Sequence, residues 1–402
     1  MKIKVLIRAF YTFYVISILT GCVSSKIYNL FDDGSYKSEV LSDSIPISFR
    51  LGLSIINVKI NGESFDFMVD TGAPNIISES LAEKLNLPLL GTSQASDIHG
   101  ATEELEIVRL DTVTIGVSDF INTVALVSNL KNGPLGCLDI DGIIGSNLMR
   151  HAIWDFDFPK SLLRINAEAT LVDTNNKNKY QSKIFVGVDG TPAIISKLNG
   201  MKVLNTTIDL GSNGGVEFSL KEYYKAKSKK LIEDENKGIG SSTYGIFSLG
   251  ESESSYETNV KRLTIGDLEL ADQLVSFEGT RGKEIGMDFW KDYRLIINWF
   301  DRKLTLIPSL EKAEVKDNTQ GFGLIWSNNN LYVSSLLIGS VFEKAGLELG
   351  DRIISINDAD YSEVSLEDYC KFLANDFGLS DIEELSFEVI GGNGERRKIE
   401  IR

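Results

Sequence analysis

The chain has 402 residues, of which 43% are hydrophobic and 24% are charged, as in globular proteins that form several domains. Its formal net charge is −16, and no basic cluster stands out, which argues against a nucleic-acid partner. With 35 glycines and only 7 prolines, the composition suits a turn-rich β protein better than a disordered chain.

The N-terminus predicts export. Three basic residues precede an apolar run, 9–19, which is short for a membrane span and typical of a secretory signal. The sequence Leu-Thr-Gly-Cys at 19–22 resembles the lipobox of bacterial lipoproteins, which implies a lipid on Cys22 and a membrane partner. An uncleaved membrane anchor is the alternative. We expect residues 1–22 to be the signal, residues 23–44 a tether, and the rest to face the periplasm or cell surface.

The cysteines and histidines predict no metal, cofactor or serine-hydrolase site. Cys137 and Cys370 fall in different predicted domains, so we expect no disulfide between them. His99 and His151 are the only histidines, and neither lies in a motif typical of a catalytic base. We expect both to be loop or surface residues.

Two segments of the chain repeat each other. Residues 65–79 contain an apolar strand that ends in Asp70-Thr-Gly-Ala, and residues 204–219 contain one that ends in Asp209-Leu-Gly-Ser. A second pair follows: Gly145 in an Ile-Ile-Gly stretch corresponds to Gly286 in Glu-Ile-Gly. The offsets are 139 and 141 residues, so the motif pair has been duplicated.

Each half shows the alternation of apolar and polar residues that is typical of strands, with Gly-Asp and Asn-Gly turns between them. We therefore predict a mostly β fold with two similar lobes at 45–168 and 180–309. The few helices are expected at 78–85, 145–151, 220–226 and 286–293.

An aspartate after an apolar strand, followed by a flexible glycine, can be held by backbone donors. Two such carboxylates within about 3 Å cannot both ionise easily, so the pair shares one proton. The ionised carboxyl can then act as general base toward water, and the protonated one can polarise a scissile carbonyl. Asp70 and Asp209 are the candidate pair.

These motifs resemble the catalytic loops of retropepsin-like and pepsin-like aspartic peptidases, whose lobes are β barrels, over about residues 45–309. The resemblance implies a hydrolase of peptide or protein substrates in which Asp70 and Asp209 are catalytic and small neighbours support the loops. The supporting residues are Thr71, Gly72, Ala73, Gly211 and Ser212. It also implies hairpin flaps over the site, with Gly100 in the first and 238–250 as a candidate second.

One position departs from the family pattern. The residue after each aspartate usually supplies a hydroxyl that locks the two loops together, and Thr71 fits, but Leu210 has no hydroxyl. Ser212 has a hydroxyl that can reach the outer oxygen of Asp209. The second half of the site is therefore the weaker match.

The C-terminal region, 316–402, resembles an α+β PDZ domain, through Ala-Gly-Leu, Gly-Asp-x-Ile and Ile-Asn in order along 345–357. In such domains a peptide adds as a strand beside a sheet edge, and its carboxylate meets a glycine loop. The expected loop is Gly321, Phe322, Gly323 and Leu324, with a groove-lining helix at 365–373. A structural brace without a ligand is the alternative.

The sequence thus predicts an exported, membrane-anchored aspartic endopeptidase whose PDZ domain recruits substrates. A lipid-anchored peptide-binding scaffold on a degenerate peptidase fold is the main alternative, and Leu210 supports it. Because one chain carries both aspartates, a monomer is favoured; a homodimer that pairs two copies of Asp70 is the other arrangement.

Overall fold

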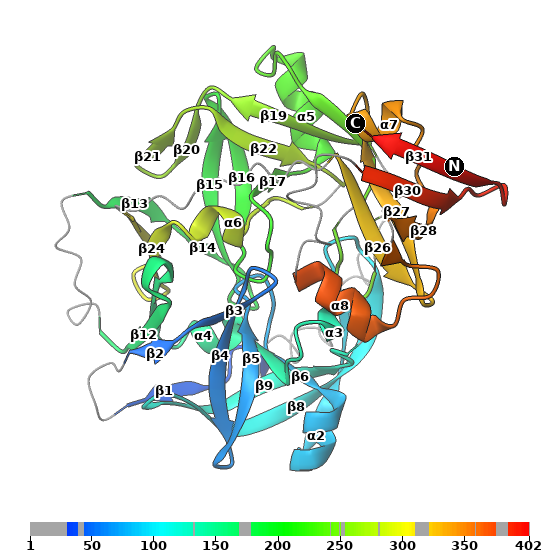
Figure 1. Cartoon of the computed structure of the whole chain (residues 1–402). Helices are drawn as coiled ribbons and strands as arrows, with labels where there is room; N and C mark the ends of the chain where they lie inside the picture. The colour runs from blue at the N-terminus through cyan, green and yellow to red at the C-terminus, as the bar shows by residue number, and fades with distance from the viewer. Residues whose placement is uncertain are drawn as a thin grey trace, which may run out of the picture.

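The computed structural model describes residues 30–38, 44–131, 133–168, 178–241, 243–248, 250, 254–279, 282–309, 321–357, 359–374 and 385–401. The predicted signal with Cys22, and residues 23–29 of the predicted tether, lie outside these ranges. Figure 1 shows two β lobes, with a third, smaller unit beside the second lobe at the C-terminal end. No helix within the described ranges is both long and apolar enough to cross a membrane.

The first lobe is a nine-stranded sheet. In its strand β4, exposed Asn57 and Lys59 alternate with buried Val58 and Ile60, the two-residue period of a strand with one face on the core. The strands are β1 (Ser35–Lys37), β3 (Ser48–Arg50), β4 (Leu53–Ile60), β5 (Glu63–Val69), β6 (Ile76–Ser78), β7 (Leu89–Ser96), β8 (Thr102–Ile115), β9 (Ser118–Ser128) and β10 (Gly142–Ile144).

A six-stranded sheet joins the two lobes. At its centre β11 of the first lobe pairs antiparallel with β24 of the second, and Arg294 makes two hydrogen bonds, of 2.7 and 2.6 Å, to the buried Asp155 across this boundary. The strands are β2 (Ile45–Pro46), β11 (Ile153–Asp157), β12 (Leu162–Asn166), β13 (Tyr180–Lys183), β24 (Tyr293–Asn298) and β25 (Lys303–Pro308).

The second lobe and the C-terminal unit share one continuous sheet. The second lobe contributes β14 (Phe185–Val186), β15 (Pro192–Leu198), β16 (Met201–Ile208), β17 (Val216–Phe218), β18 (Asn236–Gly240), β19 (Ser254–Val260), β20 (Leu263–Ile265), β21 (Leu268–Leu270), β22 (Gln273–Phe277) and β23 (Glu284–Ile285). The C-terminal unit contributes β26 (Phe322–Ser327), β27 (Asn330–Leu337), β28 (Arg352–Ile356), β29 (Ala359–Asp360), β30 (Leu385–Ile390) and β31 (Arg396–Ile401).

The helices are short, and five of them, α2, α4, α5, α6 and α8, lie where the sequence predicts a helix, whereas α3 and α7 were not predicted. Ser78 begins α2 by accepting a hydrogen bond from the N–H of Leu81 at 3.2 Å, and Asn86 ends it in the left-handed region. The helices are α2 (Glu79–Leu85), α3 (Gly133–Gly136), α4 (Ser146–Met149), α5 (Leu220–Ser228), α6 (Met287–Trp290), α7 (Val341–Lys344) and α8 (Leu366–Ala374), with a 3₁₀ turn at Phe158–Lys160.

The predicted tether at 23–44 is wrong for part of its length. Ser35–Lys37 form β1, which pairs antiparallel with β9, and Phe31 is buried in the main core. The side chain of Tyr36 packs edge-on against Phe120 at 5.4 Å between ring centres. The segment has no visible period because only three of its residues enter the sheet, and a strand this short gives no repeat to read.

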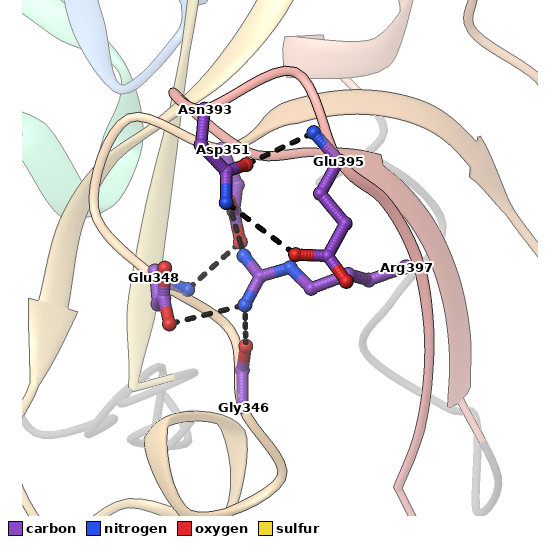
Figure 2. A network of polar contacts seen from close by, with 6 residues as sticks. All are labelled: Gly346, Glu348, Asp351, Asn393, Glu395 and Arg397. Carbon is purple, nitrogen blue, oxygen red and sulfur yellow. Dashed lines mark hydrogen bonds and ion pairs between the residues drawn. The ribbon is translucent and has the colours of Figure 1, made fainter.

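An ion-pair network closes the C-terminal unit on itself (Figure 2). Asp351, which precedes β28, is only 1% exposed, and Arg397 from β31 donates to both of its oxygens at 2.6 and 2.8 Å. Arg397 also contacts Glu348 at 3.0 Å and the carbonyl of Gly346. A buried carboxylate needs such partners, so this pair fixes the final hairpin against the body of the unit.

The C-terminal unit is fastened to both lobes. Strand β18 of the second lobe pairs antiparallel with β27, with Ile239 opposite Leu336. A disulfide joins Cys137 of the first lobe to Cys370 of α8, with their Cα atoms 5.0 Å apart. The prediction that these cysteines do not pair is therefore wrong, because it treated the domains as separate, whereas α8 lies directly against the segment after α3.

This crosslink predicts a measurable loss of stability in the double variant Cys137→Ala/Cys370→Ala. The bond closes a loop between residues 233 positions apart, so its removal frees the unfolded chain and lowers the free energy of unfolding by roughly 2–4 kcal/mol. Urea unfolding of the two proteins checks this, with reduced wild type as the control. An unchanged midpoint contradicts the expectation.

Candidate active site

Both aspartates end a strand that is backed by a parallel strand from the second motif of the repeat. Strand β10 lies parallel to β5 in the first lobe, and β23 lies parallel to β16 in the second. The N–H of Asp70 donates to the carbonyl of Ile144 at 3.0 Å, and the N–H of Asp209 donates to that of Ile285 at 3.0 Å. The duplicated motifs thus build two copies of one local structure.

Two glycines let the copies meet. A Cβ added at Gly72 would lie 2.7 Å from a carboxylate oxygen of Asp209, and one at Gly211 would lie 2.2 Å from the carboxyl carbon of Asp70. Real side chains do not approach so closely, so any other residue at either position would push the opposite aspartate away. The glycines therefore allow the two loops to approach each other, in addition to forming the turn after each aspartate.

The hydroxyl of Thr71 connects the two loops from one side only. It donates to the carbonyl of Ile208 and accepts from the N–H of Leu210 at 3.0 Å. Leu210 cannot return this contact, and its side chain is fully buried instead. At Leu210, apolar packing therefore replaces the second of the two hydroxyl contacts that would join the loops.

The carboxyl of Asp70 is buried against that of Asp209, and the two side chains are hydrogen-bonded to each other. The N–H groups of Gly72, at 2.6 Å, and of Ala73 donate to Asp70. Burial raises the pKa of Asp70 well above its usual value, and the charge of Asp209 raises it further. One proton is therefore held between the two carboxyls.

Asp209 receives more donors than Asp70. The N–H groups of Gly211, at 2.9 Å, and of Ser212 donate to it, and it is also hydrogen-bonded to the side chain of Glu284. The hydroxyl of Ser212 pairs with Glu284 and accepts from the N–H of Gly214 at 3.2 Å. Burial raises the pKa of Asp209, while these hydrogen bonds oppose that rise.

Sequence reasoning missed the carboxyls behind Asp209. Glu284 on β23 is only 9% exposed and lies directly across from Glu217 on β17. Burial, with the charges of Glu278 and Asp209, raises the pKa of Glu217 to about 8. The available signal was that Glu284 stands before Ile285-Gly286, at the position that Ile143 occupies before Ile144-Gly145 in the first copy of the repeat.

One cavity of about 1240 Å³ contains both aspartates. That volume exceeds the usual range of small-molecule pockets and suits an extended chain segment. The β7–β8 hairpin covers it from the first lobe, with Gly100 in the turn at its tip. Ser248 donates to Asp97 of that turn at 2.7 Å, and Thr243 lies 3.5 Å from the ring of His99. The two predicted flap segments therefore touch over the site.

The glycine loop of the C-terminal unit opens into the same cavity. Gly321, Phe322, Gly323 and Leu324 line it together with Tyr369 and Leu373 of α8. Within the described residues β26 pairs with β27 alone, which leaves its other edge facing α8 and the cavity. The far part of the groove is covered by the first lobe, because a Cβ on Gly136 would lie 3.4 Å from Leu366 and Cys137 is bonded to Cys370.

No group of three or more His, Cys, Asp or Glu side chains arranged to hold a metal ion occurs in the described parts of the chain. The arrangement that is present, two buried carboxyls sharing a proton in a large cleft, is suited to general acid–base chemistry on a bound water.

Comparison with known proteins identifies two regions. Residues 56–148 match the family model described as aspartyl protease, and residues 311–376 match the model described as PDZ domain. The first match contains Asp70 but ends before Asp209, which is connected to it by the internal repeat. No curated protein matches the chain.

One solved structure is compared with the chain. The crystal structure of basic 7S globulin from soybean is 10% identical, with a TM-score of 0.40, and the match covers 66% of this chain and 95% of that one. This match carries no argument about fold or function. The chain is a mostly β protein that contains an aspartyl protease domain in its first lobe and a PDZ domain at its C-terminal end.

Proposed function

We propose that this protein is an exported aspartic-type endopeptidase, anchored to a bacterial membrane through Cys22, in which Asp70 and Asp209 activate a water molecule. The observation that carries the proposal is the hydrogen-bonded pair of half-buried carboxyls, one from each lobe, inside a cavity of about 1240 Å³. Export and lipidation rest on the sequence at 1–22.

The pair supports a reaction without a covalent intermediate. The ionised carboxyl takes a proton from water as the water oxygen attacks the scissile carbonyl carbon, and the protonated carboxyl gives its proton to the carbonyl oxygen. When the resulting diol collapses, the C–N bond breaks and the amine nitrogen takes the proton that came from water. The other carboxyl recovers its proton from a diol hydroxyl, which restores the starting state.

The PDZ domain supports a substrate that is a polypeptide. Its open β26 edge and the loop Gly321–Leu324 border the cavity that holds the carboxyls, so a chain seated there has a direct path to them. The first lobe covers the groove beside Leu366 and Cys370, so a peptide in the groove can extend only toward the cavity.

The scaffold alternative keeps one specific observation in its favour, the one-sided lock between Thr71 and Leu210. The homodimer alternative is less economical, because Asp209 of the same chain already occupies the position that a second Asp70 would take. Both alternatives differ from the proposal in what single substitutions do.

Asp70→Asn should lower kcat/KM on a peptide pool by roughly a hundredfold to ten-thousandfold, because the amide can neither donate the acid proton nor accept one. The exposed Asp267→Asn is the matched control and should cleave like wild type. Circular dichroism should show the same fold in all three proteins. Wild-type cleavage rates in Asp70→Asn would rule out the peptidase mechanism.

Asp209→Asn separates the single-chain site from the homodimer. In the single-chain site it should cost as much activity as Asp70→Asn, because the carboxyls act as a pair. A homodimer of Asp70 sites should retain activity in this variant. Kinetics and the sedimentation of the active species decide between them.

Glu217→Gln should change how stability depends on pH. The pKa of Glu217 is raised from 4.5 to about 8, so over that interval the folded protein holds a proton that the unfolded chain releases. Stability therefore falls as pH rises from about 4.5 to 8, and glutamine removes this loss. In thermal unfolding, the Tm of Glu217→Gln should rise relative to that of wild type as the pH approaches 8. The Tm of the exposed Glu269→Gln should differ from that of wild type by the same amount at every pH. Parallel curves for Glu217→Gln contradict the assignment.

A further inference from the structure

The two halves of the site differ at matched positions. Ile143 on β10 lies opposite Met68, two residues before Asp70, and Glu284 on β23 lies opposite Thr207, two residues before Asp209. Ile143 is 2% exposed and packs in the core, while Glu284 is 9% exposed and touches the dyad. A position that is apolar in one copy therefore carries a buried acid in the other.

The same exchange occurs on the neighbouring strand. Ile143 pairs with Ile76 across β10 and β6, whereas Glu284 pairs with Glu217 across β23 and β17. Placing a half-buried Glu217 opposite the buried Glu284 costs stability that the first lobe avoids with isoleucine. The fold does not need these acids, so the position of Glu284 against Asp209 calls for a role at the site.

The surroundings decide the protonation state of Glu284. The titratable groups that face it are Asp209, Asp70 and Glu217, all of them acids, and Glu217 in turn faces Glu278. Burial raises the pKa of Glu284 well above its usual value, and the charges of Asp209 and Glu217 raise it further. The hydroxyl of Ser212 donates to Glu284 and opposes part of this rise in pKa. A neutral carboxyl has one O–H donor, and the carboxyl that accepts from it is Asp209.

We propose that Glu284 is a positioning residue: its neutral carboxyl donates a hydrogen bond to Asp209 and makes Asp209 the ionised member of the dyad. Asp209 then has three donors, from Gly211, Ser212 and Glu284, against two for Asp70. Donors favour the charged form of a carboxyl, so Asp70 holds the shared proton.

This assigns the two roles in the proposed reaction, on which the inference rests. Asp209 is the base that removes the proton from water, and Asp70 is the acid that protonates the carbonyl oxygen. Glu284 keeps its own proton throughout, so the balance of protons between water, substrate and dyad is unchanged. It also stabilises Asp209 where Leu210 provides no hydroxyl.

The test compares Glu284→Gln with Glu284→Met, which have similar size and differ in the donor. Glutamine can donate to Asp209, and methionine cannot. Loss of a hydrogen bond to a charged group should raise the pKa of Asp209, so the acid limb of kcat/KM against pH should move upward by about one to two units in Glu284→Met. The rate below neutral pH should fall about tenfold or more, and Glu284→Gln should lie closer to wild type.

A merely structural role would lower activity evenly across pH and would not separate the two variants. Coincident pH profiles in wild type and Glu284→Met overturn the inference, while loss of cleavage in Asp70→Asn keeps the proposed function intact. The exposed Glu269→Gln is the control for replacing a glutamate that lies outside the cavity.

A second measurement does not depend on cleavage. With ¹³C-labelled aspartate side chains, the signal of Asp209, identified by its loss in Asp209→Asn, should titrate at higher pH in Glu284→Met than in wild type or Glu284→Gln. Equal titration midpoints in the three proteins overturn the inference even if no peptide is cut. Cleavage that survives Asp70→Asn would instead overturn the proposed function.

Discussion

The structure depends on bringing two carboxyls into contact inside the protein, where each opposes the ionisation of the other. The contact is possible only because Gly72 and Gly211 have no Cβ. A Cβ on Gly72 would lie 2.7 Å from an oxygen of Asp209, and one on Gly211 would lie 2.2 Å from the carboxyl carbon of Asp70. Around this point the chain uses the same device twice: a strand ends at the aspartate and a parallel strand holds its N–H. The sheet shared by β11 and β24 then fixes the lobes at the required distance.

The repeat made the fold and the pair predictable, because a duplicated motif specifies both halves and their relation. It also misled where the halves differ. Ser212 was expected to offer its hydroxyl to Asp209, but its N–H does so and the hydroxyl pairs with Glu284. The repeat itself gives no reason to expect an acid at Glu284, because its counterpart is Ile143, so the exchange of an apolar residue for a glutamate is the signal at this position.

The disulfide could not be predicted for a different reason. Cys137 and Cys370 lie 233 residues apart, in units that each have their own core, and nothing in either local pattern reports how those units pack. Packing between domains is decided by surfaces assembled from distant segments. The pairing of β18 with β27 could not be predicted for the same reason. The edge strand of the second lobe is extended by a strand of the C-terminal unit, and neither local sequence indicates that partner.

These connections change what the PDZ domain can do. A domain on a flexible linker would capture a chain anywhere and deliver it by diffusion, with a gain set by effective concentration. Here the groove is fixed to the second lobe by hydrogen bonds and to the first lobe by a covalent bond, and its glycine loop lines the cavity that contains Asp70 and Asp209. In the proposed peptidase, capture and positioning over the two aspartates are therefore one event, because a chain end bound at Gly321–Leu324 would already lie inside the cleft. For the proposed reaction, this preorganisation avoids the entropy cost of a second encounter, and it confines the expected substrates to segments that can thread beneath the touching flaps.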